Sequence, residues 1–116
     1  TAPENVEQEI EELLNVYNSK SHISLEDIID FHVRFEQIHP FGDGNGRVGR
    51  IIMFKECLKN NFMPFIVLDD DKPYYLRGLK EYETDRMFLM DTIGYEQDLY
   101  EKMSEELLNF EIEEND

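Results

Sequence analysis

Hydrophobic residues recur every three or four positions along most of the chain, which is the spacing of one face of an α-helix. This pattern predicts helices over residues 1–19, 24–38, 45–59, 74–82 and 85–110. The stretch at residues 62–68 is short, apolar and interrupted by Pro64, so we expect it to be extended. The sequence therefore predicts an all-α fold, a compact helical bundle that forms a single domain over residues 1–116.

The predicted helix boundaries rest on residues with strong positional preferences. Pro3 and the acidic residues beside it suit the first turn of a helix. Ser24 followed by Asp27 resembles a capping box, which would open the second helix. The acidic end of the chain, residues 111–116, is expected to fray. One face of the first helix is expected to be buried, and its apolar residues are Val6, Ile10, Leu13, Leu14 and Tyr17.

A glycine-rich stretch, HPFGDGNGRVGR at residues 39–50, separates the second predicted helix from the third. Its small turn-forming residues accept positive φ and leave backbone N–H groups uncovered. If a helix begins at about Asn45 or Gly46, its first amides and the positive end of its dipole face the same hollow. The stretch therefore predicts a site for a phosphorylated ligand in a loop between two core helices. The turn-forming residues are Gly42, Gly44, Asn45 and Gly46.

Four side chains in this stretch have the chemistry that such a ligand needs. Arg47 and Arg50 are three residues apart, so on a helix both guanidinium groups share a face and can bind phosphate oxygens. Asp43 offers a carboxylate where a nucleotide-bound magnesium is usually held, although a turn aspartate bonded to its own backbone is the alternative. His39 has a reference pKa near neutrality, which suits a general base, whereas a lone histidine is more often structural.

Residues 39–50 resemble the signature of the Fic family, HPFx(D/E)GNGRxxR, at every specified position. Most members that resemble this chain transfer AMP from ATP to a hydroxyl side chain of a target protein. The resemblance implies the all-α Fic fold, with His39 as the base for the attacking hydroxyl and Asp43 as the ligand of Mg²⁺. The implied phosphate ligands are Gly44, Asn45 and Gly46 for the α-phosphate and Arg47 and Arg50 for the β- and γ-phosphates.

Other functions remain open alongside AMP transfer. Family members with lysine at the position of Gly46 resemble phosphotransferases, so Gly46 favours AMP over phosphate or another nucleotide. We expect the chain to lack upstream family elements such as the target-docking hairpin, in which case it would be a nucleotide-binding or regulatory module without transfer activity. Residues 44–49 also fit the GxGxxG pattern of dinucleotide-binding folds, but no buried strand precedes them, which argues against that fold.

The resemblance also concerns residues outside the motif. Tyr74 and Tyr75 fall where nucleotide-contacting aromatic residues occur in the family, and plain packing is the alternative. Many members are inhibited by a helix with the pattern (S/T)xxxE(G/N), from which residues 92–97, TIGYEQ, differ at one position. We interpret this near match as coincidence, and we expect an inhibitory segment or antitoxin to lie outside this chain.

Charge and composition limit the partners. The formal net charge is −16 at pH 7, so the field of the whole protein repels nucleic acids and anionic membrane surfaces. No stretch reads as a transmembrane helix or a signal peptide. The single cysteine, Cys57, excludes an internal disulfide and fits a cytoplasmic location. We therefore expect ATP and a protein target as partners, and neither nucleic acid nor a membrane.

Overall fold

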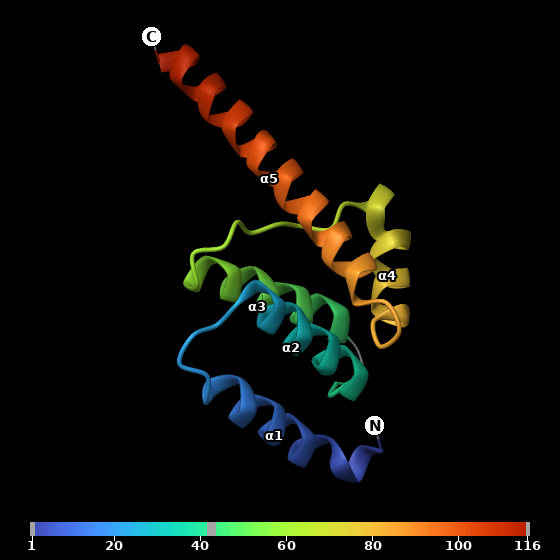
Figure 1. Ribbon diagram of the computed structural model, residues 1–116. Helices are drawn as coiled ribbons and strands as arrows, with labels where there is room; N and C mark the ends of the chain where they lie inside the picture. Colours follow the sequence, from blue (N-terminus) through green and yellow to red (C-terminus); the bar gives the residue numbers. More distant parts are fainter. Residues whose placement is uncertain (1, 42–43, 116) are drawn as a thin grey trace. The chain divides into compact units, whose positions relative to one another are not determined.

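The computed structural model describes residues 2–41 and 44–115 of the 116-residue chain, and Figure 1 shows it as a ribbon. Every regular element in the described residues is helical, so the all-α prediction is confirmed. Two short 3₁₀ helices, η1 and η2, precede α1 and α4. The elements are η1 (Pro3–Asn5), α1 (Val6–Asn18), α2 (Leu25–Ile38), α3 (Asn45–Lys59), η2 (Asp69–Asp71), α4 (Lys72–Glu81) and α5 (Arg86–Asn115). None of these helices is long and apolar enough to cross a membrane.

The chain forms two compact units, Thr1–Phe62 with α1, α2 and α3, and Met63–Asp116 with α4 and α5. The residues of the glycine-rich motif belong to the first unit, whereas Tyr74 and Tyr75 belong to the second.

In the first unit, α2 packs against both α1 and α3 (Figure 1). The predicted capping box opens α2, because Ser24 Oγ accepts from the backbone N–H of Asp27 at 3.1 Å and Asp27 Oδ2 accepts from the backbone N–H of Ser24 at 2.9 Å. The Lys20 ammonium, 2.7 Å from Asp27 Oδ1, and these hydrogen bonds lower the pKa of Asp27 to about 2. The buried apolar residues of α2 are Ile28, Ile29, Phe31, Val33, Phe35 and Ile38.

Helix α1 covers α2 less completely than its pattern predicts. No residue of α1 is fully buried, and Leu14 is 41% exposed, so the prediction of a buried stripe is wrong for this residue. The reason is that α1 lies at one side of the three helices and contacts mainly α2. Tyr17 of α1 contacts both other helices of this unit. Its ring lies 4.9 Å from that of Phe31 on α2, and its hydroxyl donates to Glu56 Oε1 on α3 at 2.7 Å.

In the second unit, α4 packs closely against α5. A Cβ at Gly78 would lie 3.0 Å from Cα of Leu89, so the two helices approach at a residue that has no side chain. Residues 62–68 are extended, as predicted, and Gln97 Nε2 on α5 donates to the carbonyl of Met63 at 2.8 Å. The prediction that the helix frays from residue 111 is wrong, because α5 continues to Asn115. Glutamate is a good helix former, so the acidic end extends the helix.

Candidate nucleotide-binding and catalytic site

Helix α2 ends at His39 in a conformation that is unusual for a residue other than glycine. His39 is the C-cap of α2 with φ 56° and ψ 60°, in the left-handed region, and its N–H donates to the carbonyl of Phe35 at 3.1 Å. Such conformations cost about 1–3 kcal/mol and tend to occur at functional sites. The side chain of His39 is exposed, so the imidazole is accessible to an incoming hydroxyl group.

The side chain of Asn45, at the start of α3, is hydrogen-bonded to the backbone of Phe41 in the motif loop. Its Oδ1 accepts from the backbone N–H of Phe41 at 2.7 Å, and its Nδ2 donates to the carbonyl of Phe41 at 2.7 Å. The side chain is buried, with Asn45 only 4% exposed. Because Nδ2 carries two hydrogens, one of them is not used in this pair. Asn45 therefore shapes the loop, and its implied contact with the α-phosphate stays a prediction.

The first turn of α3 has the features of an anion site. Gly44, at φ +79°, is its N-cap, and no side chain caps this turn in the described part of the chain. The first regular bond of the helix runs from the N–H of Val48 to the carbonyl of Gly44 at 3.0 Å, so the amides of Asn45, Gly46 and Arg47 have no partner within the helix. Their N–H groups and the positive end of the helix dipole favour a negatively charged ligand.

The guanidinium of Arg50 lies against this same turn. A Cβ at Gly46 would be 2.9 Å from Nη1 and 3.7 Å from Cζ of Arg50. Gly46 has helical backbone dihedrals, so its small size serves this close approach and not the positive φ that its residue type suggested. A cation beside the positive end of a helix is unfavourable by itself, and a bound anion would make the arrangement favourable. Arg47, three residues earlier on α3, is exposed.

Glu36 is a further residue of this site, and it was not predicted from the motif. It precedes His39 by three residues on α2, and its Oε1 would lie 2.5 Å from a Cβ at Gly49. Burial raises the pKa of Glu36, while the charges of Arg50 and His39 act in the opposite direction. Its spacing from His39 and its place among buried residues of α2 are signals that could have identified it.

The aromatic residues that the resemblance singles out have unequal exposure. Tyr74 is 58% exposed on α4, whereas Tyr75 is 1% exposed, in the core of the second unit. An open ring is available for stacking at Tyr74, and Tyr75 packs inside the unit. Their implied contact with a nucleotide stays a prediction.

Two motif residues, Gly42 and Asp43, lie outside the described residues. The structure therefore does not test the fit of Asp43 to Mg²⁺. Among residues 2–41 and 44–115, no three His, Cys, Asp or Glu side chains gather closely enough to hold a metal ion. The predicted magnesium site at Asp43 stays a prediction.

Comparison with known proteins supports the reading of the motif. Residues 1–57 match the model of the Fic/DOC family. The chain is 36% identical over 66 residues to a probable protein adenylyltransferase of Aquifex aeolicus, a match that covers 57% of this chain and 20% of that protein. It is 26% identical over 81 residues to the protein adenylyltransferase fic-1 of Caenorhabditis elegans, covering 67% of this chain and 16% of that protein. Residues 1–57 thus match the Fic/DOC family, as the motif predicted.

The matched part spans a fifth or less of the length of these two relatives. The names of these relatives support nucleotidyl transfer to protein as the general activity of this group.

Proposed function

We propose that this chain forms the catalytic core of a protein adenylyltransferase, which moves AMP from Mg-ATP to a serine, threonine or tyrosine hydroxyl of a target protein. The observation that carries the proposal is the position of Arg50, whose guanidinium lies against the first turn of α3, where no side chain of the described residues forms a cap. An arginine at that place is favourable when phosphate oxygens bind both the guanidinium and the helix amides. The names of the relatives from Aquifex aeolicus and Caenorhabditis elegans support AMP as the transferred group.

His39 acts as the general base in this proposal. It takes the proton of the target hydroxyl while that oxygen forms a bond to the α-phosphorus of ATP. The bond from this phosphorus to the oxygen that bridges to the β-phosphate breaks, and pyrophosphate leaves with the electron pair. Glu36 precedes His39 by three residues on α2 and its carboxyl lies against Gly49 of α3, which supports a base and a phosphate site where the C-terminal end of α2 meets the first turns of α3.

The other motif residues hold the nucleotide. The backbone amides at Gly44 and Gly46, with the second hydrogen on Nδ2 of Asn45, bind the α-phosphate. Arg47 and Arg50 bind the β- and γ-phosphates. Asp43 would hold the Mg²⁺ of the substrate, which supplies positive charge that offsets the charge of the phosphates. The protein thereby contributes mainly positioning and charge stabilisation, which is what phosphoryl-type transfer requires.

Labelled ATP tests the proposal directly. The chain is incubated with a cell lysate and with ATP that carries the label on either the α- or the γ-phosphate. We expect protein to acquire the α-label and not the γ-label. His39→Ala should lower the rate of labelling by roughly 10²- to 10⁴-fold while ATP binding persists. His22→Ala is the matched control, because His22 is exposed and precedes α2 by three residues.

Each other outcome assigns a different function. Transfer of the γ-label means phosphotransfer. ATP binding without transfer of either label means a nucleotide-binding module. Full labelling by the His39→Ala variant removes His39 as the base.

A further inference from the structure

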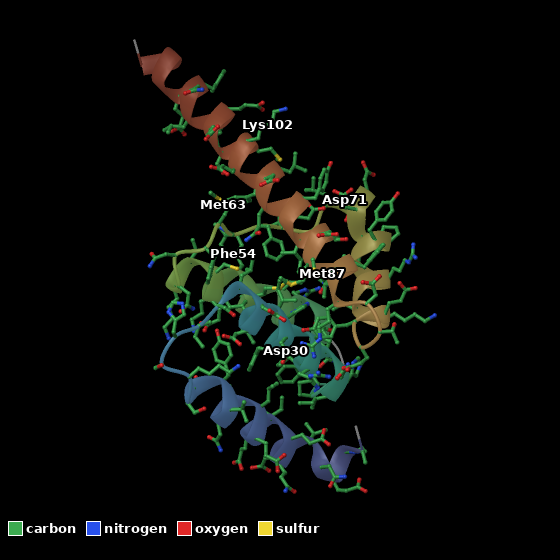
Figure 2. The ribbon with its side chains drawn as sticks, in the orientation of Figure 1. Asp30, Phe54, Met63, Asp71, Met87 and Lys102 are labelled. Atoms are coloured by element: carbon green, nitrogen blue, oxygen red, sulfur yellow. The ribbon has the colours of Figure 1, made fainter. Side chains whose placement is uncertain are left out.

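The second unit contains a cavity of about 410 Å³ that the proposed reaction does not use. Three carboxylates line it, from the end of η2 and from α5, together with two tyrosines, one on α4 and one on α5. Figure 2 labels Asp71 at the start of α4. No basic side chain is among the described residues that line the cavity. These residues are Asp71, Tyr74, Asp91, Thr92, Tyr95 and Glu96.

Glu96 is the unusual member of this set. It is 1% exposed, and apart from the carboxyl of Asp71, with which it can share a proton, neither of its carboxyl oxygens has a hydrogen-bond partner in the described residues. A buried carboxylate without other donors is unfavourable, because it loses its hydration and gains little in return. The carboxylates lie at different depths, with Asp91 exposed, Asp71 half-buried and Glu96 buried.

We propose that this cavity binds an organic cation that carries a guanidinium group. A guanidinium is planar, has five N–H donors and can bind a carboxylate with two parallel hydrogen bonds, which supplies what Glu96 lacks. Tyr74 and Tyr95 provide aromatic rings at the cavity, which attract such cations. The same carboxylates would repel the phosphates of a nucleotide, so this is a second site that does not depend on the proposed function.

A metal ion fits this cavity less well than an organic cation. A metal needs several ligands within its short bonding distance, and no three acidic, histidine or cysteine side chains in the described residues are arranged in that way. A guanidinium extends over several atoms and can therefore bind carboxylates that do not all gather around one point.

The protonation of Glu96 supports the geometric argument. Burial, and after it a hydrogen bond with the carboxyl of Asp71 and the charge of that group, raise the pKa of Glu96 to about 7. The other titratable groups that line the two cavities to which Glu96 belongs are Asp71 from η2, Tyr74 from α4, and Asp91, Tyr95, Tyr100 and Glu106 from α5. None of these provides a positive charge. A guanidinium that binds here therefore displaces a proton from Glu96.

The test is a titration of the intact chain with methylguanidinium chloride, followed through the backbone amide signals by NMR. We expect saturable shifts at residues 91–97, and an affinity that increases as the pH rises through about 7. Glu96→Gln should weaken binding by at least about tenfold. Glu101→Gln is the matched control, because it removes one charge from an exposed position of the same helix and should leave the affinity unchanged.

A second variant and a second ligand complete the experiment. If Glu96→Gln does not fold, Asp91→Asn takes its place, and it should weaken binding several-fold, because Asp91 is an exposed lining residue. A blocked arginine tripeptide that binds more tightly than methylguanidinium indicates an arginine side chain of a protein as the natural ligand, and equal or weaker binding indicates a free small molecule. Shifts that do not saturate, or an equal loss in the Glu101→Gln control, would overturn the site.

Discussion

Arg50 and Gly46 lie one helical turn apart on α3, and the guanidinium of Arg50 occupies the space that a side chain at residue 46 would need. A Cβ there would be 2.9 Å from Nη1, which is closer than real Cβ contacts allow. The absence of a side chain at Gly46 thus lets a positive charge lie on the first turn of the helix. This contact is the basis of the nucleotide site that we propose.

Gly46→Ala should move the guanidinium of Arg50 away from this turn. We expect ATP to bind about tenfold more weakly, which corresponds to about 1.4 kcal/mol, in a calorimetric titration. The thermal stability should change little, since alanine is the better helix former. Gly94→Ala is the control, because a Cβ at Gly94 meets nothing within 4 Å. It should stabilise the chain by about 0.5–1 kcal/mol and leave ATP binding unchanged. Equal ATP affinity in the Gly46→Ala variant would argue against the role of this contact.

Gly49→Ala should destabilise the first unit. A Cβ at Gly49 would lie 2.5 Å from Oε1 of Glu36 and 3.2 Å from Cε1 of His32, so α2 and α3 would have to separate or repack. Overpacking of this kind costs about 1–3 kcal/mol, which urea denaturation measures. A variant as stable as the wild type would show that Glu36 moves aside without cost.

Asn45→Ala should destabilise the motif loop, whatever its effect on the transfer reaction. The substitution removes both hydrogen bonds to the backbone of Phe41, which are partly buried, at a cost of roughly 1–3 kcal/mol for the two together. Asn60→Ala is a comparison with one lost bond, from Nδ2 to the carbonyl of Glu56 at 2.8 Å, and it should cost less. Similar urea midpoints for the two variants would contradict the clamping role of Asn45.

His32 makes stability depend on pH. Burial lowers its pKa from 6.5 to about 4, so the unfolded chain binds a proton at this residue at a higher pH than the folded chain does. Stability should therefore fall as the pH decreases from about 6.5 to about 4, on the order of 2–3 kcal/mol from this group. Urea midpoints across this range should vary less in His32→Gln than in the wild type. An unchanged pH dependence in the variant would show that other groups cause the fall.

Local residue preferences were sufficient to predict most of the helices. Ser24 and Asp27 form the capping box, and α3 begins at Asn45, because these signals act within one helical turn. The extended character of residues 62–68 likewise follows from local composition. The predicted features that failed depend on distant parts of the chain. Leu14 is exposed because only α2 covers α1 extensively, which periodicity within α1 does not reveal.

The arrangement of the candidate site was predicted only in part. The motif indicated an anion site at the start of α3, and the resemblance named His39 and Arg50. The left-handed conformation of His39 and the place of Glu36 beside Gly49 were not predicted. Both depend on how α2 and α3 pack, because a residue type alone does not determine which side chain of a neighbouring helix it will contact.

Amide chemical shifts during a titration with Mg-ATP test the central claim most directly. The claim is that the first turn of α3 holds the phosphates beside His39. We expect the largest shifts at the amides of Asn45, Gly46 and Arg47, with saturation, and we expect the affinity to fall at least about tenfold in Arg50→Ala. Small shifts at these amides, or an affinity that Arg50→Ala leaves intact, would contradict the account.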